Sequence, residues 1–199
     1  MQPPQQIRIS RMQLNLFRLT ACVFATVLFL WIGEQEASTQ SLKKTASPTV
    51  AKSSTDALVP TRTRVPAPDL RLIDINQKAL NLGDYRGKVV LLDFWAVDCG
   101  GCVIEIPWYV EFDKKYHDKG LQVIGIDMYG ESPAYIKPFM QKSHMQYPVA
   151  VGNDDIRNRF HADELPKTIL IDRQGRVAVT HVGIVDKATF EKDIQYLLK

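Results

Sequence analysis

Two cysteines separated by two residues, Cys99 and Cys102, are the strongest chemical signal in the 199-residue chain. A thiolate, rather than a thiol, is the nucleophile in thiol–disulfide exchange. With a two-residue spacer on a helix, the second cysteine lies one turn from the first and can attack a mixed disulfide formed there. The spacing therefore predicts thiol–disulfide exchange, with Cys99 exposed and attacking and Cys102 more buried and resolving.

The elements around the cysteines would position them for this chemistry. Residues 88–95 are a near-continuous apolar run, which is typical of a strand buried on both faces. Residues 102–115 show helical spacing, and we expect Pro107 to interrupt and kink this helix. Cys99 would then lie where a strand gives way to a helix, and the unpaired N–H groups and the helix dipole favour an anion there.

Further segments complete a mixed sheet covered by helices. The alternating residues 70–82 predict a small hairpin, and the turn chemistry of residues 173–176 predicts an antiparallel one. The pattern predicts strands and helices in an order that gives an α/β fold. The strands are residues 121–127, 147–151, 168–172 and 177–182, and the helices are residues 133–142, 154–160 and 187–198.

The N-terminal part predicts a membrane association. Residues 19–33 contain no charge, arginines precede them, and two glutamates follow, so the rest of the chain would be exported. An uncleaved anchor (residues 1–33 with a cytoplasmic stub) is favoured over a cleaved signal peptide, because the cleavage site is poor. Residues 19–22 look like a lipid-attachment box, but the apolar run follows Cys22 instead of preceding it. We interpret Cys22 as a small apolar residue of a membrane helix.

A polar tether and one globular domain follow. Residues 34–63 are rich in Ser, Thr, Ala and Lys without apolar periodicity, which predicts a flexible linker. Residues 64–199 would form the domain. The net charge is +3, and the first 63 residues carry that whole excess, which fits membrane insertion better than nucleic-acid binding.

The chain from residue 66 onward resembles the TlpA/ResA-like branch of the thioredoxin superfamily. The resemblance implies a thioredoxin-like fold with a central mixed sheet flanked by helices and an N-terminal hairpin. It also implies an extracytoplasmic location and disulfide exchange with proteins. The matching pieces are residues 67–70, residues 82–88, the Phe94-Trp95-Ala96 run before the CxxC, Pro107, residues 165–168 and residues 170–176.

The resemblance also implies roles for residues outside the cysteine pair, which would cycle through a Cys99–Cys102 disulfide. Asp93 would be a buried carboxyl with a raised pKa that relays a proton to Cys102, and Glu105 would serve the same end. Pro166 would be cis and face the cysteines, with the backbone of Leu165 pairing with a substrate strand. The alternatives are a satisfied polar group for Asp93, a solvated helix residue for Glu105 and a plain loop proline for Pro166.

Four residues around the cysteines carry further predictions. Asp98 stands where the branch usually has Trp, and its carboxylate should raise the pKa of Cys99 and favour a reductant; the alternative is that Asp98 only caps the helix. Gly101 stands where the branch usually has Pro, and Gly100 and Gly101 would let a substrate backbone approach closely. Trp95 would either support the loop at the substrate side or fill the core.

We therefore expect an extracytoplasmic oxidoreductase that reduces protein disulfides, receives electrons from a membrane donor and uses no cofactor. Two alternatives stay open: a thiol peroxidase of the same fold, although Val97-Asp98 lacks the usual Thr, and a Cu(I) carrier using the same cysteines. The four histidines lack zinc-site spacing. Covalent haem would need a histidine at the position of Val103. Substrate, direction of electron flow and oligomeric state are not encoded visibly.

Overall fold

The structure, a computed structural model, describes residues 57–199. The predicted membrane segment, Cys22 and most of the predicted linker lie outside the described residues. Within residues 57–199, no helix is both long enough and apolar enough to span a bilayer.

The centre of the domain is a five-stranded sheet in the order β5-β4-β3-β6-β7. β3 (Val89–Trp95) is parallel to β4 (Leu121–Asp127), which is parallel to β5 (Val149–Val151). β6 (Lys167–Ile171) and β7 (Val177–Val182) complete the sheet with antiparallel pairings. Every residue of β3 is buried, as its apolar run predicts. The predicted mixed sheet is confirmed.

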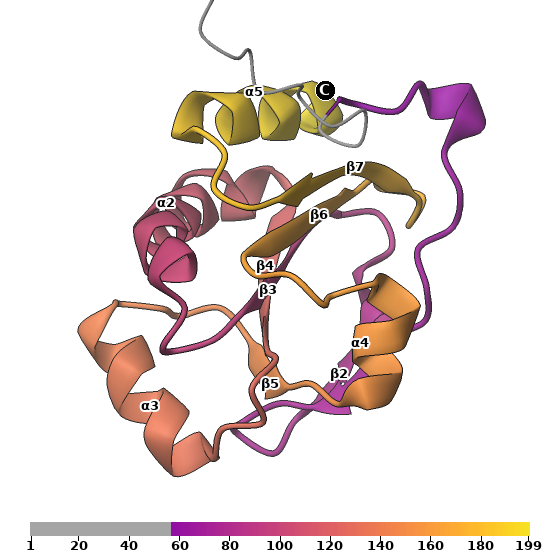
Figure 1. Ribbon diagram of the computed structural model, residues 1–199. Helices are drawn as coiled ribbons and strands as arrows, with labels where there is room; N and C mark the ends of the chain where they lie inside the picture. The colour runs from indigo at the N-terminus through magenta and orange to yellow at the C-terminus, as the bar shows by residue number, and fades with distance from the viewer. Residues whose placement is uncertain (1–56) are drawn as a thin grey trace, which may run out of the picture. The chain divides into compact units, whose positions relative to one another are not determined.

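Helices cover both faces of this sheet (Figure 1). α2 (Gly100–Tyr116), α3 (Pro133–Lys142) and α5 (Lys187–Leu198) pack on one face. α4 (Asp154–Phe160) packs on the other face, together with the small hairpin of β1 (Arg71–Ile73) and β2 (Ala79–Asn81). The apolar side chains of each strand alternate between these two cores, so the sheet is buried on both sides.

α2 differs in two ways from the sequence prediction. It begins at Gly100, because Cys99 is its N-cap residue, and it continues to Tyr116. The helix runs on through Pro107, which was expected to interrupt it, and Pro107 lies on the exposed side. A proline there removes one backbone hydrogen bond, and the packing of the helix on the sheet is enough to hold both halves.

The edge strand β7 is covered by the segment that leads into the domain. Val59 N–H donates to the carbonyl of Ala178 at 2.7 Å, and Val177 N–H donates to the carbonyl of Val65 at 2.8 Å. This edge strap (residues 58–67) occupies backbone groups that an open edge would leave unpaired. Residues 58–63 were assigned to the flexible linker, and the structure places them against the domain.

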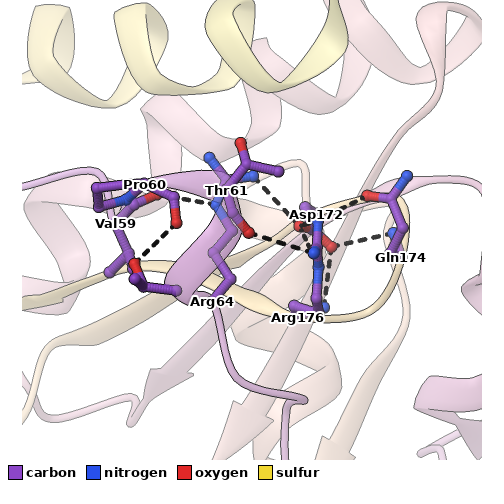
Figure 2. A network of polar contacts seen from close by, with 8 residues as sticks. Val59, Pro60, Thr61, Arg64, Asp172, Gln174 and Arg176 are labelled. Carbon is purple, nitrogen blue, oxygen red and sulfur yellow. Dashed lines mark hydrogen bonds and ion pairs between the residues drawn. The ribbon is translucent and has the colours of Figure 1, made fainter.

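One buried ion pair fastens the edge strap (Figure 2). Arg64 Nη1 lies 3.2 Å from Asp172 Oδ2, and both side chains are only 4% exposed. Asp172 also accepts hydrogen bonds from the backbone and the guanidinium of Arg176. These hydrogen bonds outweigh burial and lower the pKa of Asp172. The carboxylate therefore connects the entry of the domain to the β6–β7 turn.

Candidate active site

The two cysteines lie at the junction of β3 and α2. They form a disulfide, with Cα atoms 5.3 Å apart. Cys99 is the N-cap residue of α2, and the backbone N–H of Cys102 donates to Cys99 Sγ at 3.2 Å. Four unpaired N–H groups and the positive end of the helix dipole are available at such a terminus. The same contact would stabilise a thiolate on Cys99 after reduction.

The exposed fractions of the two cysteines differ less than we expected. Cys102 is 1% exposed and Cys99 is 8% exposed. The predicted order is correct, but the prediction that Cys99 is exposed is wrong for the disulfide form. Cys99 is therefore the more accessible of the two cysteines.

The loop that contains Pro166 lies against the start of α2, next to the cysteines. The Leu165–Pro166 peptide bond is cis, as the resemblance implies. A Cβ atom added to Gly101 would lie 2.9 Å from Pro166 Cδ and 3.2 Å from Ile184 Cγ1. The loops before β6 and after β7 thus touch the first turn of α2. The same test at Gly100 finds open space, so Gly100 leaves room for an approaching chain.

Glu105, on the same helix as Cys102, lies at the centre of a buried group of hydrogen-bonded polar side chains. Its side chain accepts hydrogen bonds from Tyr109 Oη at 2.9 Å and from the backbone N–H of Val185 at 3.1 Å. Tyr109 Oη in turn lies 2.7 Å from the hydroxyl of Thr168. Glu105 is 1% exposed, so the alternative of a solvated helix residue is wrong. Burial raises the pKa of Glu105, although its hydrogen bonds oppose the shift.

Asp93 is the second buried carboxyl of this face. It is 1% exposed, and its Oδ2 atom has no hydrogen-bond partner among the described residues. Burial, and then the negative charge of Glu105, raise the pKa of Asp93 well above its usual value. The burial and the raised pKa of Asp93 are as predicted. The alternative, a fully hydrogen-bonded polar group, is wrong, because one carboxylate oxygen of Asp93 has no partner among the described residues. Two carboxyls that cannot both ionise easily are suited to holding one proton.

A histidine extends the network to α5. His181 of β7 lies opposite Thr168 of β6, and its Nε2 atom lies 3.3 Å from Asp193 Oδ2. The His181 ring also meets the ring of Phe190 edge-on at 4.8 Å. Positive charge on His181 lowers the pKa of Glu105. His181 is 1% exposed, so it is a buried polar residue of the domain.

Two other predictions concern the residues before Cys99. Asp98 is exposed and is not the helix cap, because Cys99 holds that position, so the capping alternative is wrong. Trp95 is 0% exposed and stacks on Phe139 at 5.3 Å. Trp95 therefore fills the core and cannot contact a substrate directly, which corrects its assignment to the substrate-binding set.

Sequence reasoning missed Tyr109, Thr168 and Val185. Tyr109 lies four residues after Glu105, a spacing that places two side chains on one helix face and could have revealed it. Val185 contributes only a backbone N–H, for which the sequence carries no signal. Among residues 57–199, no three His, Cys, Asp or Glu side chains are grouped so that they could hold a metal ion.

The sheet order and the position of the CxxC at the β3–α2 junction limit the protein families to which the chain can belong. Residues 63–180 match the profile of the AhpC/TSA family. The chain belongs to the AhpC/TSA family. Within the AhpC/TSA family, the redox cysteines of this member are Cys99 and Cys102, which the structure joins in a disulfide.

Similar proteins define the branch of the AhpC/TSA family more closely. The chain is 30% identical over 130 residues to the thiol-disulfide oxidoreductase ResA of Geobacillus kaustophilus, covering 65% of this chain and 74% of that protein. It is 29% identical over 134 residues to ResA of Bacillus subtilis, covering 67% and 74%. A Chlorobium tepidum structure assigned as thiol:disulfide interchange protein DsbE superposes with a TM-score of 0.64 at 31% identity, covering 68% and 97%.

These similarities and the geometry agree on fold and enzyme class. The domain has a thioredoxin-like fold, and this AhpC/TSA member is a thiol–disulfide oxidoreductase that acts on protein thiols or disulfides.

Proposed function

We propose that the chain is an extracytoplasmic reductase of protein disulfides, tethered to the membrane by its N-terminal segment. The observation that supports it most is the pair of buried carboxyls, Asp93 and Glu105, behind a disulfide whose inner sulfur is nearly inaccessible. A reductase must deprotonate its resolving thiol in a site from which water is largely excluded, and such a pair can accept that proton.

The reaction then proceeds in two exchanges. The Cys99 thiolate attacks one sulfur of a substrate disulfide, so that a Cys99–substrate bond forms and the substrate S–S bond breaks. Cys102 next gives its proton to the carboxyl pair and attacks Cys99 Sγ. The Cys99–Cys102 disulfide forms, the second substrate thiolate leaves, and two electrons have passed to the substrate.

The residues around Cys99 would receive the substrate. Gly100 faces open space, and the backbone of Leu165, beside the cis Pro166, would pair with an extended substrate segment. Gly101 is held against Pro166, so its role is to let that loop approach the cysteines. Asp98 is exposed beside Cys99, and its charge would raise the pKa of the attacking thiol and favour the reducing direction.

The N-terminal segment supports the location. Its apolar run follows arginines, and the proteins that this chain resembles include ResA. An oxidising exterior would keep the cysteines as a disulfide, so a reductase there needs electrons from a membrane donor. Alkaline extraction of membranes and protease protection of spheroplasts would test the anchor and the side on which residues 57–199 lie.

The redox potential tests the direction. The full-length chain in detergent is equilibrated against graded glutathione or dithiothreitol couples, and the Cys99–Cys102 state is read by alkylation and mass spectrometry. We expect a potential near that of thioredoxin, about −270 mV. A value near about −120 mV would identify an oxidant and refute the reductase proposal.

Two parallel assays separate the alternatives. Consumption of hydrogen peroxide by the reduced chain would identify a peroxidase, and retention of Cu(I) by the reduced Cys99–Cys102 pair would identify a copper carrier. Reduction of insulin disulfides with neither of these activities is the result that the proposal requires.

A further inference from the structure

A second pair of carboxyls lies beside the cysteine loop, at the end of β4. Asp127 is the last residue of β4, pairs in register with Trp95 of β3, and is 0% exposed. Glu131 follows four residues later and is half-buried, although its immediate neighbours in this loop, which leads to α3, are exposed. Neither residue takes part in the exchange described above, although both adjoin the segment that contains Cys99.

Hydrogen bonds connect these carboxyls to the cysteine loop. The backbone N–H of Val97, two residues before Cys99, donates to Glu131 Oε2 at 3.3 Å. The backbone N–H of Glu131 donates to Asp127 Oδ2 at 2.9 Å. The end of β4 is also joined to β3 by the N–H of Met128, which donates to the carbonyl of Trp95 at 2.9 Å. The position of the cysteine loop therefore depends on where the Glu131 carboxyl lies.

One atom of the pair requires a donor. Asp127 Oδ1 is buried and accepts no hydrogen bond from the described residues. Two ionised carboxylates are acceptors only, so a hydrogen bond between the Asp127 and Glu131 carboxyls requires one proton between them. A shared proton would supply the donor that the buried oxygen lacks, and it would remove one negative charge from the site.

We propose that Asp127 and Glu131 share a proton and act as positioning residues for Cys99, so that loss of this proton changes the reactivity of the Cys99 thiol.

The surrounding charges determine the pH at which this happens. Burial, the hydrogen bond to Asp127 and the charges of Asp127 and Asp98 raise the pKa of Glu131 to about 7. On the neighbouring α4, the Arg157 guanidinium donates to the carbonyl of Met128 and lies 3.9 Å from Asp154. Arg157 is thus engaged elsewhere along this edge, and Asp127 and Asp98 are the charged groups that act on Glu131.

Ionisation of Glu131 should change the pKa of Cys99 in one direction. Below pH 7 the pair holds its proton, and Asp98 and one shared negative charge lie near the cysteine loop. Above pH 7 all three carboxyls are ionised. Added negative charge disfavours a thiolate, so the pKa of Cys99 should be higher after Glu131 ionises than before. The alkylation rate of Cys99 should then rise with pH in two steps, one of them near pH 7.

The experiment measures that profile in the full-length chain. A Cys102→Ser background keeps Cys99 from re-forming the disulfide, and the alkylation of the Cys99 peptide by iodoacetamide is followed by mass spectrometry from pH 5 to 10. Reading this one peptide separates Cys99 from Cys22. We expect Glu131→Gln to give a single-step profile and at least about a threefold higher rate at pH 8. Glu111→Gln, which changes an exposed glutamate of α2, should leave the two-step profile in place.

A carboxyl titration tests the shared proton without any thiol chemistry. In the ¹³C spectrum of the glutamate-labelled chain, the signal that Glu131→Gln removes should titrate near pH 7, and Asp127→Asn should lower its midpoint by more than one unit. A wild-type midpoint near the ordinary glutamate value of about 4.3 would overturn the proposal. Identical alkylation profiles for wild type and Glu131→Gln would overturn it as well.

These readouts are distinct from the reductase proposal. They require that Cys99 is a reactive thiol, but they involve no substrate protein and no electron donor. If Asp127→Asn does not fold, the wild-type titration and the Glu131→Gln profile still decide the question. An oxidising potential would refute the reductase and leave the shared proton intact.

Discussion

Asp93 of β3 lies directly opposite Thr168 of β6, so a carboxyl and a hydroxyl share the sheet face that α2 covers. The hydroxyl of Thr168 meets Tyr109 Oη at 2.7 Å, and Tyr109 reaches Glu105. The side chains of Asp93 and Thr168 on the sheet therefore lie under the N-terminal half of α2. Cys99 caps this helix and Cys102 lies in its first turn, and under the proposed mechanism a proton that leaves Cys102 enters this network.

Replacement of Asp93 by Asn should stabilise the fold in a pH-dependent way. Because the pKa of Asp93 is raised, the folded state binds its proton more tightly than the unfolded state. That contribution is complete below the unfolded value of about 3.9 and is lost as the pH rises through the higher folded pKa. The variant cannot ionise, so its free energy of unfolding should exceed that of wild type by an amount that grows from pH 5 to 9.

Urea unfolding at pH 5, 7 and 9 measures this difference, which we expect to exceed about 1.4 kcal/mol at the alkaline end, the equivalent of one pKa unit. The same variant should reduce insulin more slowly than wild type. A stability difference that does not change with pH would mean that Asp93 does not ionise in this range.

Replacement of Tyr109 by Phe should alter the acid–base behaviour of the site as well as its stability. The hydroxyl donates to Glu105, and this bond lowers the pKa of the carboxyl, so its loss should shift that pKa further upward. We expect a loss of about 1–2 kcal/mol of stability and an acid limb of the pH–rate profile that moves to higher pH.

Tyr116→Phe is the matched control, because Tyr116 is the last residue of α2 and its hydroxyl donates to Glu191 of α5. It should cost some stability and leave the pH–rate profile unchanged. Equal shifts in both variants would assign the effect to general loosening of α2.

Replacement of Gly101 by Ala should slow exchange, whereas Gly100→Ala should not. The added Cβ at Gly101 would overlap Pro166 and press on Ile184, so the loops must move, at a cost of about 1–3 kcal/mol. At Gly100 the methyl group meets nothing within 4 Å, and Ala is the better helix former. Thermal unfolding and insulin reduction of both variants measure this contrast. A Gly101→Ala enzyme with wild-type activity would show that contact between Pro166 and the cysteine turn is not needed.

Replacement of Asp172 by Ala should destabilise the domain by about 3–5 kcal/mol, since it leaves the buried Arg64 without its partner. The pKa of Asp172 is lower in the folded state than in the unfolded state, where it is about 3.9. The stabilisation by Asp172 is therefore present above the unfolded-state pKa and is lost as the pH falls through the folded-state pKa. Asp69→Ala is the comparison, because the Asp69–Arg71 pair is exposed and should contribute under about 1 kcal/mol. Denaturant midpoints at pH 7 and pH 4 test both statements, and equal losses in the two variants would contradict them.

The sequence predicted the regular elements well, because their signal is periodic. β4, β7, α3, α4 and α5 have the predicted bounds. The two predicted hairpins are also confirmed, one within residues 70–82 and one around the turn at residues 173–176. Each of these elements buries one or two faces, and the spacing of the apolar residues in the sequence shows which faces these are.

What the sequence could not predict depends on long-range contacts. The Glu131–Val97 bond spans 34 residues and uses a backbone donor, and the His181–Asp193 pair joins a strand to a helix. Residues 58–63 of the edge strap were expected to be flexible because their composition is polar, yet Arg64 and a few backbone hydrogen bonds attach the strap to the domain. The roles of Asp93, Glu105, Asp98 and Leu165 in catalysis stay predictions.

The edge strap also determines how the domain would respond to mechanical tension. A pull applied at residue 57 would first load the backbone hydrogen bond from Val59 to Ala178 of β7, and then the Arg64–Asp172 ion pair. Ala178 lies on β7 and Asp172 lies in the β6–β7 turn, and β6 separates β7 from β3. The strap can therefore peel away from the edge while the strand that ends at the cysteines stays in register, and thiol chemistry would continue on a domain under load.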